Sequence, residues 1–100
     1  MADHNGYNAS ILQDDTNCCY LCGRRSGKLD RHEIYGASNR KKSKALGLWV
    51  VLCHRPCHLE LAHGDRDTMD LLHRRGQIAA MNHYMLDRKE FINLIGRSYI

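Results

Sequence analysis

The stretches CYLC at residues 19–22 and CHRPCH at residues 53–58 decide the fold of this 100-residue chain. Each contains a pair of closely spaced cysteines, and the four are Cys19, Cys22, Cys53 and Cys57. Two ligands on one tight turn, repeated on a second turn, can reach the corners of a tetrahedron, and thiolates favour Zn²⁺. The two pairs therefore predict a structural zinc site that staples the chain.

The rest of the sequence favours bound metal over disulfides. The first residues are polar and do not look like a signal peptide, and no apolar run approaches membrane-spanning length. We therefore expect a cytoplasmic protein in a reducing compartment, where paired cysteines more often bind metal than each other. Three alternatives stay open: Cys18 in place of Cys19, His54 in place of one cysteine, or free buried thiols or disulfides.

Length and charge set the broad class. A chain of 100 residues makes one small domain with a marginal hydrophobic core, so we expect a structural metal or disulfides to stabilise it. We expect a flexible polar tail at residues 1–8 and a single domain at residues 9–100. The formal net charge of +4 and the pI of about 8.9 are compatible with a polyanionic partner.

Hydrophobic patterning predicts a mixed α+β chain. Two strands are expected, at residues 29–35 and 48–52. Helices are expected at residues 9–15, about 56–63 and roughly 66–84, and from residue 87 onward. The other segments are interpreted as a cysteine-containing turn at 18–27 and a basic loop at 36–44.

Particular residues set the expected helix boundaries. Pro56 suits the first position of its helix because proline needs no backbone donor there, and Arg55 and His54 should lie outside the helix. Gly64 is expected to end the same helix. The expected N-terminal caps of the later helices are Asp65 or Asp67, and then the capping-box pair of Asp87 and Glu90.

The motifs around the cysteines are similar to those of a known enzyme family. DRHEI at 30–34, LWVVLC at 48–53, CH at 57–58 and the following His63 resemble the HNH nucleases of the ββα-metal type. CYLCG, RHEIYGASNRKKS, GLWVVLC and the ending EFINLIGRSYI look like a small HNH-like family often found in phages and prophages. The resemblance covers about residues 10–100. It implies a small α+β domain of the ββα-metal type, with a zinc knuckle beneath and two C-terminal helices alongside.

The resemblance also assigns a candidate site. In HNH nucleases a strand residue and one or two helix histidines bind an ion, while a neighbouring histidine takes a proton from water. His32 matches the strand ligand, Glu33 stands where the base usually stands, and His58 and His63 match the helix ligands. Two assignments stay open. Either Glu33 is the base and His32 a ligand, or His32 is the base and Glu33 or Asp30 a ligand.

Spacing and one substitution depart from the family pattern. His58 and His63 would lie about 140° apart on an ideal α-helix, too far to share an ion unless the helix end unwinds, as Gly64 permits. The middle Asn of the family is missing from the second strand. Asn39, in the basic loop, is expected to take a similar role by pinning that loop.

The resemblance implies a metal-dependent DNA endonuclease or nickase, encoded by a phage and working in the host cytoplasm. Its cuts would leave 5′-phosphate and 3′-hydroxyl ends. The catalytic candidates are His32, Glu33, Asn39 and His58. A basic run beside them is expected to grip DNA phosphates through Arg40, Lys41, Lys42 and Lys44.

Two cofactors and one alternative function complete these expectations. The cofactors are a structural Zn²⁺ and a catalytic Mg²⁺, Mn²⁺, Ni²⁺ or Zn²⁺, and a histidine-rich ligand set suits the last three better than Mg²⁺. The alternative is a catalytically inactive, zinc-stabilised module that binds nucleic acid or a phage or host protein.

Overall fold

The computed structural model describes residues 2–100, which contain two strands and five helical segments. In chain order they are β1 (Leu29–Glu33), η1 (Ala37–Asn39), α1 (Arg40–Ala45), β2 (Trp49–Cys53), η2 (His54–Ala62), α2 (Arg66–Tyr84) and α3 (Arg88–Ile95). The two strands form an antiparallel sheet. The α+β class predicted from the sequence is therefore confirmed.

The register of the hairpin sets the position of the site. Leu29 lies opposite Cys53, His32 opposite Val50 and Glu33 opposite Trp49. One end of the hairpin therefore carries Cys53, and the other end carries Glu33. The prediction placed the end of β1 two residues too late, and it placed β2 one residue too early.

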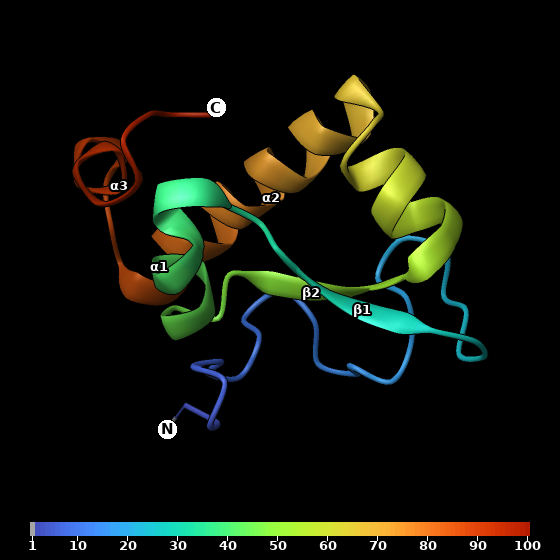
Figure 1. Cartoon of the computed structure of the whole chain (residues 1–100). Coiled ribbons are helices and arrows are strands. Elements are labelled where there is room, and N and C mark those ends of the chain that lie inside the picture. The colour runs from blue at the N-terminus through green and yellow to red at the C-terminus, as the bar shows by residue number, and fades with distance from the viewer. Residues whose placement is uncertain (1) are drawn as a thin grey trace.

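Both faces of β2 are covered, and all five of its residues are buried. On one face, Val50 and Leu52 join the main hydrophobic core with Ile34, Leu72 and Phe91. Figure 1 shows α2 on one side of the hairpin and the N-terminal segment, in blue, on the other. The sheet is therefore the middle of a small sandwich, which holds the ends of both strands in place.

The helix predicted at residues 9–15 is wrong, since this segment consists of bends and extended backbone. Its polar groups bond instead to the edge of β2 that lies opposite β1. The Ser10 hydroxyl donates to the Trp49 carbonyl at 2.6 Å, and the Gln13 side-chain oxygen accepts from the Val51 amide at 2.8 Å. Covering a free strand edge satisfies its backbone groups, and this demand outweighed the helix propensity of the segment.

The expected polar tail makes specific contacts where the structure describes it, and Met1 lies outside the described residues. The indole N–H of Trp49 donates to the Asn8 carbonyl at 2.8 Å. The Tyr7 ring packs edge-on against the Trp49 ring, with 5.4 Å between centroids. Residues 7 and 8 therefore cover the outer face of β2.

The basic loop predicted at residues 36–44 is also wrong, because most of it is helical, as η1 and α1. Its Arg, Lys and Ala residues are good helix formers, so propensity was the better guide here than charge. The buried hydroxyl of Ser43 accepts from the Tyr35 amide at 3.0 Å and donates to the Tyr35 carbonyl at 2.8 Å. These two bonds hold α1 against the end of β1.

The two C-terminal helices begin as predicted. Asp65 caps α2 by accepting from the Thr68 amide, and both bonds of the capping box at Asp87 and Glu90 are present in α3. Gly76 lets α2 approach the sheet, because a Cβ there would lie 2.7 Å from a methyl carbon of Ile34. Among residues 2–100, no helix has the length and apolarity needed to cross a bilayer.

Candidate functional site

Four cysteine sulfurs gather at the end of the hairpin that carries Cys53. The Sγ atoms of Cys19, Cys22, Cys53 and Cys57 all lie within 4.8 Å of one another. The distance from Cys22 Sγ to Cys53 Sγ is 3.8 Å. A tetrahedral zinc with Zn–S bonds of about 2.3 Å would separate its sulfurs by about 3.8 Å. The cluster could therefore hold a structural metal ion such as zinc.

The alternatives that the sequence left open for this cluster are now narrowed. Cys18 lies outside it, and its thiol points to the Asp15 carbonyl at 3.6 Å. His54 lies outside it too and is bonded to Asp30. None of the five cysteines forms a disulfide. The four residues predicted as thiolate ligands are thus the four that converge.

The surroundings of the cluster favour ionisation of the Cys19 thiol and oppose ionisation of the Cys57 thiol. Burial disfavours ionisation of Cys19, but backbone N–H groups of Cys22 and Cys53 outweigh it and lower its pKa to about 6. Burial, followed by the neighbouring thiols, raises the pKa of Cys57. Four sulfurs this close repel one another as thiolates, and a bound cation removes that repulsion.

Three histidines form a second cluster beside the first. One nitrogen from each of His32, His58 and His63 lies within 4.8 Å of the others. The His58 and His63 Nε2 atoms are 3.1 Å apart, and the His32 ring centroid lies 5.3 Å and 5.1 Å from theirs. Burial, followed by His58 and His63, lowers the pKa of His32 to about 4. Its imidazole is therefore neutral near pH 7 and keeps a lone pair for ligation.

The geometry of η2 explains how two histidines five residues apart come together. From Pro56 onward η2 is a π-helix, and the His63 amide donates to the His58 carbonyl at 3.2 Å. Bonds from i to i+5 place residues five apart one turn above each other. The helix predicted at about residues 56–63 is present, but it is a π-helix and not an α-helix. Arg55 lies outside helical geometry as expected, with φ −137° and ψ 140°, whereas η2 begins at His54, which was also expected outside the helix.

Asp30, which the sequence suggested only as a metal ligand, contacts the ring nitrogen of His58 that faces away from His63. Asp30 Oδ2 lies 2.8 Å from His58 Nδ1 and 2.7 Å from His54 Nδ1. A carboxylate in this position keeps the proton on Nδ1 and leaves Nε2 free, which also raises the basicity of a ligating histidine. The sequence signal for this pairing was the position of Asp30 two residues before His32 on the same strand, because alternate strand residues share a face.

Asp30→Asn is therefore expected to weaken binding of a divalent ion at the histidine cluster by roughly 10–100-fold, because the charge that fixes His58 is lost. Calorimetric titration of the zinc-loaded chain with Ni²⁺ measures this affinity. Asp67→Asn, which changes an exposed carboxylate on α2, is the matched control. Equal affinities for Asp30→Asn and the wild-type chain would remove Asp30 from this role.

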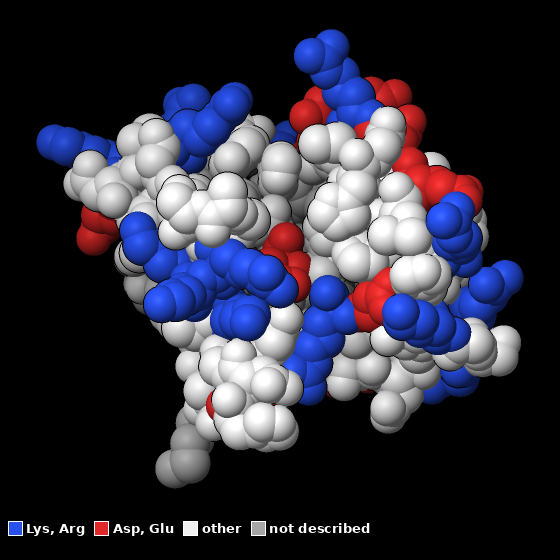
Figure 2. Space-filling view, in the orientation of Figure 1, with Lys and Arg blue, Asp and Glu red and all other residues white. Residues whose placement is uncertain are grey.

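A pocket of about 330 Å³ opens in front of the histidines. Its lining includes the three histidines and three charged side chains, namely Arg31, Glu33 and Arg40. The Arg40 Nε donates to Glu33 Oε1 at 2.6 Å. Although burial opposes it, this contact lowers the pKa of Glu33, so the carboxylate is ionised. Figure 2 shows Lys and Arg side chains gathered over α1 and a hollow between α1 and η2.

The other predicted site residues lie outside this pocket. The Asn39 side chain donates to the Ile95 carbonyl at 2.8 Å, so it pins the start of α1 to the end of α3. The Lys42 ammonium donates to the Leu94 carbonyl at 2.7 Å, and the Lys44 ammonium lies 4.8 Å from the Tyr7 ring centroid. Lys41 is exposed on α1. Of the four basic residues predicted to contact phosphate, Arg40 alone lines the pocket.

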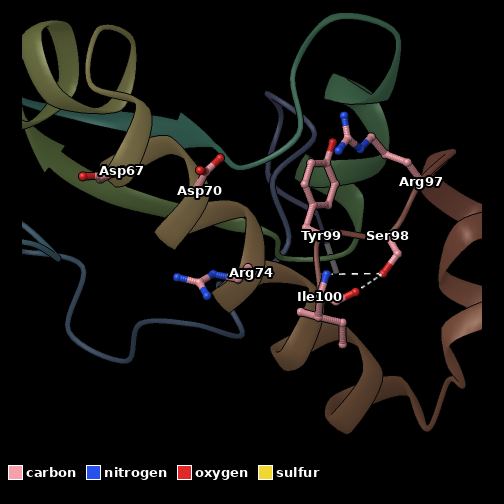
Figure 3. Close-up of a pocket in the computed structure, with 7 residues that line it drawn as sticks. All are labelled: Asp67, Asp70, Arg74, Arg97, Ser98, Tyr99 and Ile100. Atoms are coloured by element: carbon pink, nitrogen blue, oxygen red, sulfur yellow. Dashed lines mark hydrogen bonds between the residues drawn. The ribbon is translucent and has the colours of Figure 1, made fainter.

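A larger hollow of about 580 Å³ lies between α2 and the last residues of the chain. Figure 3 shows Asp67, Asp70 and Arg74 on α2, with Arg97 and Tyr99 on the segment that follows α3. Its lining contains neither histidine nor cysteine, and its carboxylates and guanidinium groups balance each other. Of these two hollows, the smaller one is therefore the one that could hold a metal ion.

Comparison with protein-family models, with curated proteins and with solved structures found no match to this chain.

Proposed function

We propose that this chain is a metal-dependent endonuclease or nickase that hydrolyses phosphodiester bonds of DNA. The observation that carries the proposal is the convergence of His32, His58 and His63 at a pocket lined by two arginines. These are the three residues that the HNH resemblance assigns to one ion. The proposed products carry 5′-phosphate and 3′-hydroxyl ends.

The donor set fits a divalent cation. Two Nε2 atoms 3.1 Å apart repel each other unless a proton or a cation lies between them. Two nitrogens bound to one zinc at about 2.0–2.1 Å would lie about 3.4 Å apart in a tetrahedron, close to the distance found here. Mn²⁺, Ni²⁺ and Zn²⁺ suit an imidazole set better than Mg²⁺. When bound, the ion would offset the negative charge that builds on the phosphate and on the leaving oxygen.

The geometry favours one of the two assignments of the catalytic base. The His32 ring faces His58 and His63, as a ligand would, and Asp30 is already engaged with His58. The ionised carboxylate of Glu33 lines the same pocket. We therefore assign Glu33 the task of taking a proton from the attacking water, with His32 as a ligand.

We further propose that the cysteine cluster binds zinc for a structural reason. Cys57 and His58 are consecutive residues, so one segment carries a sulfur ligand of the first site and a nitrogen ligand of the second. The ion held by sulfur would fix η2 against the hairpin. The histidine pocket would then be preorganised by the zinc site beneath it.

A second function, a non-cutting nucleic-acid-binding or protein-binding module, is favoured by one observation. Glu33 is held by Arg40, and a carboxylate whose pKa is lowered by a guanidinium is a weak base. If that ion pair persists when DNA is bound, water is not activated. The zinc site would still stabilise the fold in such a module.

Incubation of the zinc-loaded protein with supercoiled plasmid in Mg²⁺, Mn²⁺, Ni²⁺ or Zn²⁺ decides between the two functions. We expect nicked or linear products with at least one ion, and strongly reduced cleavage by His32→Ala under the same conditions. Intact plasmid with every ion, or equal cleavage by the variant, would leave the binding module as the better description.

A further inference from the structure

We infer that Arg31 is a phosphate-binding residue at the mouth of the histidine pocket, and that residues 3–7 of the N-terminal segment position it. This inference rests on the proposed function and names the backbone phosphates of DNA as what Arg31 binds. Arg31 was not among the basic residues predicted from the sequence to contact DNA. Its place in the structure comes from three separate contacts.

The guanidinium of Arg31 packs against two aromatic rings that also contact each other. It lies 4.4 Å from the Tyr7 ring centroid and 5.2 Å from the Trp49 ring centroid. Its Nη1 also donates to Asp3 Oδ2 at 2.9 Å. A planar guanidinium that is stacked and hydrogen-bonded loses little further freedom on binding a phosphate, whose oxygens match its fork of donors.

The fold places this cation in the lining of the pocket that holds the three histidines. Arg31 adjoins His32 on β1 and lines the same pocket as Arg40. The Arg31 side chain is 41% exposed and that of Arg40 is 63% exposed, so both cations are open to an incoming phosphate. Binding of a charged backbone at such a site depends on salt, because each neutralised phosphate releases counterions.

The Asp3–Arg31 ion pair does not compete strongly with this role. Its two side chains are 36% and 41% exposed, and exposed ion pairs contribute little to stability because water and salt screen them. The Tyr7 and Trp49 rings are uncharged, so they do not cancel the positive charge of Arg31. The arrangement therefore orients the guanidinium while leaving it available to phosphate.

Salt-dependent binding of a fluorescein-labelled DNA duplex tests this inference. The zinc-loaded His58→Ala chain serves as the parent, so that the duplex is not cut. Adding Arg31→Ala is expected to weaken binding and to reduce the slope of log K against log salt by about 1. Adding Arg75→Ala is the matched control, because Arg75 also stacks on a tyrosine, Tyr20, but lies outside the pocket. This control is expected to leave the slope unchanged.

The outcomes separate this inference from the proposed function. If the parent binds the duplex and Arg31→Ala leaves the slope unchanged, or Arg75→Ala lowers it equally, the role of Arg31 is overturned alone. If the parent shows no salt-dependent binding, the role of Arg31 fails, while plasmid cleavage by the wild-type chain decides the proposed function separately.

A second measurement tests the role of the N-terminal segment. In the cleaving wild-type chain, Tyr7→Leu is expected to raise KM severalfold while kcat stays within about twofold. In the Arg31→Ala chain the same change is expected to have no further effect, since its effect is exerted through Arg31. Additive effects of the two changes, or a loss confined to kcat, would overturn the positioning role.

Discussion

Replacing Cys57 with serine is expected to unfold the chain near room temperature. Cys57 is buried and belongs to the cluster of four sulfurs. A structural zinc of this kind contributes apparent binding energies of about 10–16 kcal/mol near neutral pH. The net stability of a small domain is about 5–15 kcal/mol, so losing one of four ligands removes a large share of what holds the fold.

Thermal unfolding followed by circular dichroism, together with the zinc content of the purified chain, measures this effect. We expect Cys57→Ser to lose both its zinc and its cooperative transition. The matched control is Cys18→Ser, because Cys18 lies one residue before the cluster but outside it. A Cys57→Ser chain that melts cooperatively at the wild-type temperature would show that the sulfurs do not hold the fold.

Replacing His58 with alanine is expected to abolish most DNA cleavage without unfolding the chain. The half-buried His58 ring faces His63 through Nε2 and Asp30 through Nδ1. Even a residue that only supports a ligand contributes roughly 10–100-fold to metal affinity or activity. Loss of the ligand itself should therefore lower the cleavage rate by at least about 100-fold.

Rates of plasmid nicking at saturating Mn²⁺ or Ni²⁺ check this prediction, with zinc content and melting temperature measured on the same samples. His83→Ala is the matched control, since His83 is exposed on α2 and belongs to no cluster. A His58→Ala chain that cuts at the wild-type rate would exclude the histidine pocket as the active site.

Much of the framework could be predicted from short-range sequence signals. The start of α2 follows from Asp65 and the capping box of α3 from Asp87 and Glu90, because these side chains bond to the nearest backbone. The cysteine pairs were equally informative, because two closely spaced cysteines on each of two turns are typical of structural zinc sites. These signals act within a few residues, so a linear sequence displays them.

The errors arose where distant segments decide the local structure. Residues 9–15 bond to the edge of β2, which lies far along the chain, and this contact replaces the expected helix. The π-helical turn of η2 was missed because an α-helix was assumed. The sequence analysis therefore needed an unwound helix end to bring His63 to His58, whereas the π-helical turn itself brings them together.

The supporting residues of the site were the hardest to find. Strand alternation places Asp30 on the same face as His32, but its bond to His58 also depends on how η2 packs against the hairpin. The placement of Arg31 depends on Tyr7, in a segment expected to be a loose tail. Sequence patterns located the cysteines and histidines that converge, whereas tertiary packing determines which residues surround them.

The most direct test of the account is the number and kind of metal ions bound per folded chain. We predict one zinc that resists mild chelation and one further ion that exchanges with added Mn²⁺ or Ni²⁺. His32→Ala and His58→Ala should each lose the exchangeable ion and keep the zinc. A wild-type chain that binds a single ion in total, or histidine variants that bind both, would contradict the proposal that sulfur holds the fold while imidazole serves the reaction.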